Sequence, residues 1–303
     1  MSGLEIVDAH HHLADLSRSY PWLEGPLRVR YHGNDLPLRR SYFLDDYLGD
    51  VGGYRLIGSV HVENGAADPW AEATWIDSIH AARGLPSVQV AKVSLLDDDA
   101  PAQLERLAAL PSVRGIRDIL NWHIDPVYTH RDRNDIITDP TWRAHFGLLS
   151  RHGLSFDLQV FPSQLLQAAE LASAFPETRI ILDHAGMPIR RDRQSMTEWR
   201  QGMRAVAAQP NVFVKVSALG TNDHRWTVDS IRPIVIDTID IFGPERAMFG
   251  SNFPVDGLYS GFARLYEAFE ELTADLPQEE RQSLFSGTAM TAYKFSGSHP
   301  GGT

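Results

Sequence analysis

Short runs of apolar residues recur along the chain, and each is followed by a stretch long enough to form a helix. Val, Ile, Leu and Phe are frequent in these runs, which is typical of strands buried in a sheet. The pattern predicts eight strands, at residues 4–12, 55–63, 88–95, 113–120, 154–160, 179–184, 212–219 and 247–255.

The segments between these strands carry apolar residues at helical spacing. The clearest sets are Leu104/Leu107/Ala108/Leu110, Leu165/Ala168/Ala169/Leu171, Ile231/Val235/Ile236/Ile239 and Phe262/Leu265/Tyr266/Phe269. Regular alternation of strand and helix indicates βαβ units and a parallel sheet. Eight such units in 303 residues favour an α/β fold of the closed (β/α)8 or TIM-barrel type over a doubly wound sheet. No glycine-rich dinucleotide or phosphate loop follows a predicted strand.

The pattern indicates a single domain. Residues 1–295 carry the barrel repeat without a linker, and the Gly-, Ser- and Pro-rich residues 296–303 are expected to form a flexible tail. Two segments are longer than ordinary connections: residues 14–50 after the first strand and residues 121–139 after the fourth. Insertions at the C-terminal ends of barrel strands commonly form lids and substrate walls. For the polar residues of the second segment, 123–135, a solvated loop is the default interpretation and a pocket wall the alternative.

Composition narrows the class of protein. The chain has 28 Lys+Arg against 39 Asp+Glu, a net charge of −11. This balance argues against nucleic-acid binding, which needs clustered basic residues to neutralise phosphates. An anionic small-molecule substrate remains compatible, because the local field of a site can oppose the global charge. The absence of cysteine excludes disulfides, thiolate metal sites and cysteine nucleophiles.

Membrane and export signals are not recognisable in the sequence. No apolar run reaches the roughly 18–20 residues of a membrane span, and the N-terminus lacks the pattern of a signal peptide. We therefore expect a cytoplasmic enzyme with a small-molecule substrate, no membrane or nucleic-acid partner and no organic cofactor. A homodimer is the default assembly.

Histidines mark the predicted ends of two strands. In the run His10-His11-His12, alternation places His10 and His12 on one face and turns His11 away. His184 ends the sixth strand, and the C-terminal ends of barrel strands meet on one rim. These three histidines, His10, His12 and His184, could therefore bind one divalent cation, Zn²⁺ or Mn²⁺, with an open coordination position. The alternatives are solvated histidines at the first strand and a hydrogen-bonded core histidine at position 184.

Five motifs carry a resemblance to a known family. They are VDAHHHL at 7–13, LSFDLQVFPSQL at 154–165, LDHAGMP at 182–188, VKVSAL at 214–219 and FGSNFPVD at 249–256. In this order they resemble the lactonase branch of the amidohydrolase superfamily, which includes sugar-lactone hydrolases and 2-pyrone-4,6-dicarboxylate lactonase. The resemblance spans residues 4–295. It implies a (β/α)8 barrel and carbonyl chemistry at the rim, and it does not specify a substrate.

The last motif departs from the family pattern. The family often has Gly-Ser-Asp before an aromatic residue and Pro, and that Asp activates water or binds metal; this chain has Asn252 instead. An amide cannot act as a general base, although it can orient water, accept a hydrogen bond or weakly ligate a metal. Asp256, His184 or a metal-bound hydroxide are then the candidates for the base. Because some members of the branch keep the His-x-His motif and work without metal, the motif leaves the metal content open.

Cations inside predicted strands are costly to bury unless they are paired. By their position in the family motifs, Arg117 and Lys215 are predicted to bind substrate, holding a carboxylate or polarising a lactone carbonyl. The alternative is an ion pair within the barrel, for example with Asp118 or Asp183. For Lys92, which lies inside another strand, we expect such an ion pair.

Gln159, His61 and His224 complete the predicted substrate-binding set. Gln159 lies at the end of the fifth strand and shares a face with Asp157. His61 lies near the end of the second strand, where a solvated strand end is the alternative. His224 belongs to a run, DHRW at residues 223–226, that follows the seventh strand closely enough to reach the site.

These observations predict a hydrolase that opens a small lactone, sugar-derived or a cyclic carboxylate, by attack of water on the ring carbonyl. The predicted catalytic residues are His10, His12, His184, Asn252 and Asp256. A metal-dependent decarboxylase or a lactone isomerase on the same barrel is the first alternative, against which the amide at Asn252 argues. A barrel that binds its ligand without turnover is the second.

Overall fold

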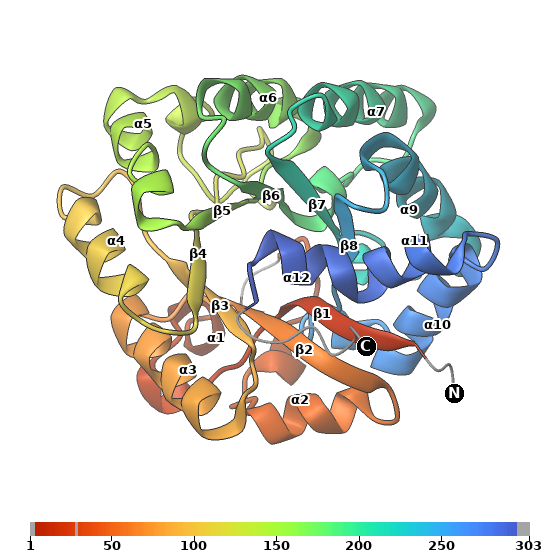
Figure 1. The fold of residues 1–303 in the computed structure, drawn as a ribbon, viewed down its shortest axis with the longest axis horizontal. Helices are drawn as coiled ribbons and strands as arrows, with labels where there is room; N and C mark the ends of the chain where they lie inside the picture. The colour runs from red at the N-terminus through yellow and green to blue at the C-terminus, as the bar shows by residue number, and fades with distance from the viewer. Residues whose placement is uncertain (1–3, 28–29, 296–303) are drawn as a thin grey trace, which may run out of the picture.

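The computed structural model describes residues 4–27 and 30–295, which form a barrel of eight parallel strands (Figure 1). The strands neighbour one another in chain order: β1 Glu5–His11, β2 Arg55–Val62, β3 Val88–Lys92, β4 Val113–Arg117, β5 Ser155–Leu158, β6 Ile180–Leu182, β7 Val212–Val216 and β8 Ala247–Phe249. The TIM barrel and all eight predicted strands are confirmed. Several predicted ends run too far; residues 250–255 leave β8 because the chain turns at Asn252, whose φ is 57°. The predicted tail, residues 296–303, lies outside the described residues.

The barrel closes where the chain beyond β8 meets β1. The backbone N–H of Asn252 donates to the carbonyl of His10 at 2.7 Å, and that of His12 donates to the carbonyl of Phe253 at 2.7 Å. Gly250 permits this approach, since a Cβ at this position would lie 2.9 Å from the Cβ of His10. The closure therefore brings the His-x-His motif directly beside the last-strand motif.

Helices form a ring around the strands (Figure 1). Their bounds are α1 Pro21–Glu24, α2 Leu44–Val51, α3 Pro69–Arg83, α4 Ala100–Ala108, α5 Pro140–Phe146, α6 Leu165–Ala174, α7 Arg193–Ala207, α8 Leu219–Asn222, α9 Val228–Phe242, α10 Phe262–Leu272, α11 Gln278–Gln282 and α12 Thr288–Ala292. Local sequence fixes several starts: Asp68 accepts hydrogen bonds from two backbone N–H groups at the start of α3, as Asp139 does for α5. The four predicted helical faces are confirmed, except that Leu110 lies beyond the end of α4.

The interior of the barrel changes from apolar to charged along its axis. Near the N-terminal ends of the strands, Val7, Val60 and Met248 pack with Ala289 and Ala292 of α12. Further along, buried polar and charged side chains replace them on strands β1, β4, β5 and β7, including His10, Arg117, Asp157 and Lys215. Since charged groups are costly to bury without partners, this polar layer marks the functional end of the barrel.

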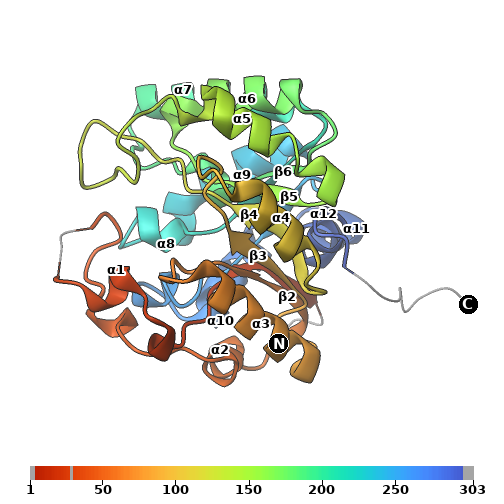
Figure 2. The ribbon, with the colours of Figure 1, turned by 90° about the vertical axis from the view of Figure 1, so that its left-hand side faces the viewer.

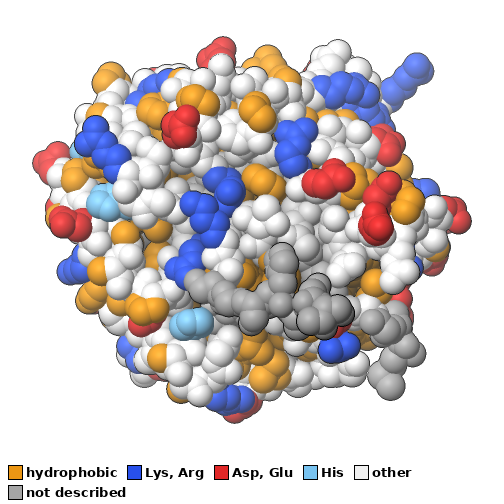
Figure 3. Space-filling view, viewed as in Figure 1, with side chains coloured by type: hydrophobic (Ala, Val, Ile, Leu, Met, Phe, Trp, Pro, Cys, Tyr) orange, Lys and Arg blue, Asp and Glu red, His pale blue; other side chains and the backbone are white. Residues whose placement is uncertain are grey.

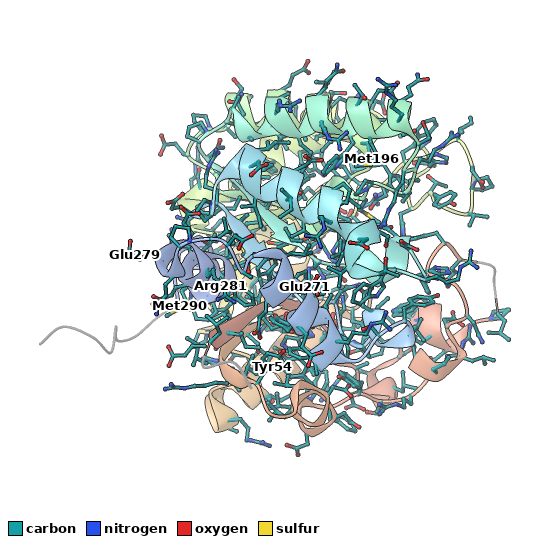
Figure 4. The ribbon with its side chains drawn as sticks, turned by 90° about the vertical axis from the view of Figure 1, so that its right-hand side faces the viewer. Tyr54, Met196, Glu271, Glu279, Arg281 and Met290 are labelled. Carbon is teal, nitrogen blue, oxygen red and sulfur yellow. The ribbon has the colours of Figure 1, made fainter. Side chains whose placement is uncertain are left out.

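The two ends of the barrel are built differently. Figure 2 shows α1, α8 and the long connections after β1 and β4 on one side, and α11 and α12 on the other. Glu279, Arg281 and Met290 lie on this second side in Figure 4. In the view of Figure 3, basic side chains gather on that closed face, where Arg114, Arg179 and Lys294 border a small surface cavity. Within the described residues, no helix combines the length and the apolar character that crossing a bilayer requires.

Candidate active site

A cavity of about 610 Å³ lies at the C-terminal ends of the strands. Its walls include Trp22, Tyr31 and His32 from the long segment after β1, and His130 and Arg131 from the segment after β4. Both segments therefore line the cavity, which for the segment after β4 is the alternative to the solvated loop that the sequence favours. This volume falls in the range of small-molecule sites.

The His-x-His motif reaches this end of the barrel through a local irregularity in β1. The outer face of β1 carries Ile6 and Asp8, and the Tyr47 hydroxyl on α2 donates to Asp8 at 2.9 Å. Simple alternation would send His10 outward with them, but the pairing of β1 with β2 shifts between Asp8 and His11. Such an irregularity re-aims a side chain, and here it turns His10 inward.

The three predicted histidines lie together. The ring of His10 is 4.9 Å from that of His12 and 4.6 Å from that of His184, measured between centroids. His11 is turned away, as expected: its ring stacks on Tyr47 at 4.0 Å. The rings of His12 and His184 line the cavity, whereas His10 is fully buried beside them.

Left-handed backbone conformations occur immediately after three consecutive strands. His184 follows β6 with φ 58°, Ala218 follows β7 with φ 55°, and Asn252 follows β8 with φ 57°. Outside glycine and asparagine such conformations are strained, and they concentrate at functional sites. All three residues line the cavity. The left-handed turn explains how His184 faces the cavity although Ile180 and Leu182, four and two residues earlier, pack outward in the helix-facing core.

Asn252 stands between His12 and a buried carboxylate. His12 Nδ1 donates to the carbonyl of Val62 at 2.8 Å, and burial lowers the pKa of His12 to about 4. A neutral His12 therefore presents an unprotonated Nε2, which lies 3.3 Å from Asn252 Oδ1. The Asn252 amide nitrogen donates to Asp256 at 3.3 Å. Two acceptors thus face each other at 3.3 Å, and a cation or a proton between them would satisfy both.

Asp256 does not line the cavity. Burial raises its pKa to about 6, but it accepts hydrogen bonds from two backbone N–H groups, at Gly220 and Thr221, from the Thr221 hydroxyl and from Asn252. These four donors leave it no free direction toward a substrate. Its contacts instead position Asn252.

Lys215 lies at the centre of a buried ion network. Its Nζ is 2.5 Å from Asp157 Oδ2, 3.2 Å from Asp183 Oδ1 and 3.2 Å from His10 Nδ1. Lys215, Asp157 and Asp183 are all fully buried. Burial would raise the pKa of Asp183, but the Lys215 ammonium and His10 together hold it well below its usual range. The ammonium charge is thus paired with two carboxylates, and His10 Nδ1 lies beside it.

Arg117 projects into the cavity from the end of β4. Its Nε donates to Glu63 Oε1 at 2.7 Å, its Nη2 to the Glu63 carbonyl at 2.7 Å and its Nη1 to Gln159 Oε1 at 3.2 Å. Because a guanidinium has five N–H donors, these contacts orient Arg117 and leave donors for a ligand. Arg117 and Gln159 both line the cavity, where the sequence predicts them.

Three predicted substrate-binding residues are not brought to the cavity wall. Lys215 is enclosed by its ion network, which is the alternative that the sequence analysis gives for it: an ion pair within the barrel. His61 is buried on the outer side of β2, with its ring 5.9 Å from that of His11. His224 stacks on Tyr259 and lines an adjoining cavity of about 340 Å³, which shares Tyr31 with the main one. Conversely, Lys92, expected in an ion pair, lines the main cavity.

The site offers ligand atoms suited to a divalent cation. His10, Asp183 and His184 each place one such atom within 4.8 Å of the others. His10 Nε2 and both carboxylate oxygens of Asp183 are buried without a hydrogen-bond partner. If His10 Nδ1 donates to Asp183, 3.5 Å away, then Nε2 is free to ligate, as in carboxylate–histidine–metal arrangements. The donor set therefore fits a zinc-type ion. It differs from the predicted set in containing Asp183, while His12 faces Asn252.

Comparisons with known proteins show the family to which the chain is related. Residues 7–295 match the family model described as amidohydrolase. Protein y4mH of Sinorhizobium fredii, described as uncharacterized, is 36% identical over 298 residues, which cover 97% of this chain and 100% of that one. L-Fucono-1,5-lactonase of Burkholderia multivorans is 32% identical over 308 residues, covering 96% of each chain.

A solved structure supports the fold. The crystal structure of an amidohydrolase from Burkholderia multivorans with bound zinc matches with a TM-score of 0.81 and 24% identity, covering 96% of this chain and 99% of that one. At this identity it speaks for the barrel alone. Because the family model spans nearly the whole chain and relatives above 30% identity cover it almost end to end, this chain is a member of the amidohydrolase family.

Proposed function

We propose that the chain hydrolyses a small lactone in the cavity at the C-terminal end of the barrel. The observation that carries the proposal is the convergence of neutral imidazoles, an amide and a cation on one cavity. His12, His184, Asn252 and Arg117 all line it. These groups can bind water, accept a proton and stabilise an oxyanion, which are the requirements for opening a cyclic ester. The lactonase named among the relatives supports this choice.

In the proposed mechanism, water lies between His184 and Asn252 and attacks the ring carbonyl. His184 Nδ1 contacts the Ser217 hydroxyl at 2.8 Å, so Nε2 is the nitrogen left to accept the proton of water. Burial lowers the pKa of His184 to about 3, which keeps the ring neutral before attack and makes it release the proton readily afterwards. The ring oxygen takes that proton as the carbon–oxygen bond breaks, which leaves a hydroxy acid.

Arg117 stabilises the charge that develops on the carbonyl oxygen. Its guanidinium is held by Glu63 and Gln159 before substrate arrives, so little reorganisation is needed. His10, Asp183 and His184 would hold a divalent cation, which would supply Lewis-acid polarisation and a lower pKa for bound water. With such an ion bound, His184 Nε2 would be a ligand rather than the proton acceptor. Lys215 keeps the ionised carboxylate of Asp183 in place beneath the two histidines.

The test is hydrolysis of a panel of five- and six-membered lactones, followed by proton release at constant pH. We expect turnover by the unmodified chain and a loss of at least ~100-fold in kcat for His184→Ala, the size typical of a lost acid–base group. His152→Ala, which changes a histidine remote from the cavity, is the matched control. Equal rates for the His184→Ala variant and the control would contradict the assigned role. Release of CO₂ from an aromatic acid, without lactone turnover, would favour the decarboxylase alternative.

A further inference from the structure

The cavity carries more positive than negative charge, although the whole chain has a net charge of −11. Its lining contains four cationic side chains, Arg30, Lys92, Arg117 and Arg131, but the carboxylates of only Glu63 and Asp118. Both carboxylates are engaged, Glu63 by Arg117 and Asp118 by Arg131. The local balance therefore opposes the global one and favours an anion.

Arg30 also has a counter-ion. Its Nε lies 3.4 Å from Asp35 Oδ2, and its Nη2 donates to the Trp22 carbonyl at 3.2 Å. Lys92 differs from the three arginines. Among the described residues its ammonium makes no hydrogen bond and no ion pair within 4.0 Å. Burial raises the pKa of Glu63, whereas Arg117 and, less strongly, Lys92 lower it; Glu63 is nevertheless held by Arg117.

The backbone aims Lys92 at the cavity. Val88 and Val90 of β3 belong to the apolar interior of the barrel, so alternation turns Lys92 to the same side. Lys92 is also the register partner of Arg117 on β4, which places the two cations side by side on one wall. The chain contains only three lysines, Lys92, Lys215 and Lys294, against 25 arginines. Of these three lysines, Lys92 alone lines the main cavity.

The position of Lys92 relative to the reacting groups defines what it can bind. In a closed eight-stranded barrel β3 faces β7, so Lys92 lies across the cavity from Ala218 and Asn252, which follow β7 and β8. Arg117 of β4 starts beside Lys92, and its guanidinium reaches to within 3.7 Å of Asp183, next to His184. A ligand whose carbonyl is near His184 and Arg117 therefore extends its far end toward Lys92.

We propose that Lys92 binds an anionic substituent of the substrate, so that the preferred lactones carry a carboxylate. This inference rests on the proposed lactone hydrolysis and specifies its substrate class. A free ammonium in a partly enclosed site gains a charge-assisted hydrogen bond from a carboxylate, whereas a hydroxymethyl group leaves its charge unpaired. Neutral sugar lactones of the same size should bind less well.

Two lactones that differ in one group provide the kinetic test. D-Glucarolactone carries a carboxylate where D-gluconolactone has a hydroxymethyl group. We expect kcat/KM to favour the first at least ~10-fold, and Lys92→Met to lower this ratio about 10- to 100-fold through KM, the range for a hydrogen bond between charged groups. Lys92→Arg should retain most of the preference. Lys294→Met, on the opposite face, is the matched control.

Amine labelling provides a second readout that does not depend on turnover. Lys294 is exposed and serves as the internal reference, while Lys215 is fully buried. We expect D-glucarate to slow acetylation of Lys92 several-fold relative to Lys294, and D-glucitol, which has no carboxylate, to do so far less. Peptide mass spectrometry measures both rates in the intact chain.

The two experiments separate failure of this inference from failure of the proposed function. Protection of Lys92 by D-glucarate without hydrolysis of any lactone would retain the anion site and refute lactone hydrolysis. Hydrolysis with no preference for the carboxylated lactone, and with equal effects of Lys92→Met on both lactones, would refute the anion site and retain the hydrolysis. Absence of both protection and turnover would refute both.

Discussion

Replacing Lys215 by methionine should strongly destabilise the fold. The ammonium is fully buried and lies within 3.2 Å of Asp157, Asp183 and His10. Methionine has nearly the same length and volume, so the substitution removes charge and hydrogen bonds with little change in packing. Asp157 then keeps the Tyr293 hydroxyl, which donates at 2.7 Å, and Asp183 keeps His10 Nδ1 at 3.5 Å and Arg117 at 3.7 Å.

The loss of folding stability arises because the carboxylates of Asp157 and Asp183 lose their cationic partner. Removing one partner of a buried ion pair typically costs about 3–5 kcal/mol, because an uncompensated charge remains. The carboxyls can escape part of this cost by binding protons. Burial already raises the pKa of Asp157 to about 6 in the presence of Lys215, and loss of the ammonium raises the pKa of both carboxyls further.

The sign of the pH dependence follows from that shift. A carboxyl whose pKa is raised by folding holds a proton that the unfolded chain has already released, so its folded form loses stability as pH rises. The loss is about 1.4 kcal/mol per pH unit for each such carboxyl. The difference between the unmodified chain and Lys215→Met should therefore be smaller at pH 5 than at pH 8.

Urea unfolding followed by circular dichroism at both pH values measures this difference. Lys294→Met removes an exposed ammonium and should stay within about 0.5 kcal/mol of the unmodified chain. Adding Asp157→Asn to Lys215→Met removes one of the unpaired carboxylates and should recover part of the loss. A cost for Lys215→Met below about 1 kcal/mol at pH 8, or one independent of pH, would refute the buried ion network.

Three further predictions concern the site and its support. The value of kcat/KM should stay level from neutral pH to about pH 5 and fall near pH 4. The reason is that burial lowers the pKa of His12 to about 4 and that of His184 to about 3. A fall near pH 6.5, the ordinary histidine pKa, would contradict neutral, desolvated imidazoles. Asn252→Asp supplies a carboxylate beside His12 and should tighten zinc binding in a chelator competition; unchanged affinity would show that position 252 does not contact the ion. Trp199→Ala should cost about 3–5 kcal/mol in urea unfolding, since the indole is fully buried and its N–H donates to the Ala185 carbonyl at 2.8 Å; a cost below 1 kcal/mol would be inconsistent with this packing.

The fold could be predicted from the sequence because strand and helix signals alternate eight times without interruption. Short apolar runs and helical spacing are local properties, and a parallel sheet of this length closes as a barrel. Strand ends were harder to predict. In the predicted strand 247–255 apolar residues resume at Phe253, but β8 stops at Phe249 because the chain turns at Asn252, whose left-handed conformation a hydrophobic pattern does not encode.

The sequence motif and the predicted strand ends identify the three histidines of the site. Simple strand alternation does not, however, explain the directions in which their side chains point. His10 faces the interior because the pairing of β1 shifts after Asp8, and His184 faces the cavity because its own φ is 58°. The sequence shows neither feature. Asp183 precedes His184 in the chain, yet its place among the possible metal ligands follows only from the turn that separates the two side chains.

The two interior lysines show a second limit of sequence reasoning. Alternation correctly turns both Lys92 and Lys215 into the barrel. Alternation does not predict how far along the barrel axis a side chain lies. Lys215 lies next to Asp157 of β5 and to Asp183, which follows β6, whereas Lys92 lies at the open rim. The buried cation is consequently paired, and the rim cation is available to a ligand. The sequence favours Lys215 for substrate binding, whereas the structure encloses Lys215 and leaves Lys92 on the cavity wall.

The measurement that most directly tests lactone hydrolysis is oxygen-isotope transfer during turnover. A hydrolysed lactone is expected to gain one oxygen atom from water, in the new carboxylate, when the reaction is run in H₂¹⁸O and the product is analysed by mass spectrometry. Incorporation of one ¹⁸O per product by the unmodified chain, with the rate reduced at least ~100-fold in His184→Ala, is the predicted result. A product without ¹⁸O, a product that has lost CO₂, or undiminished incorporation by His184→Ala would contradict the account.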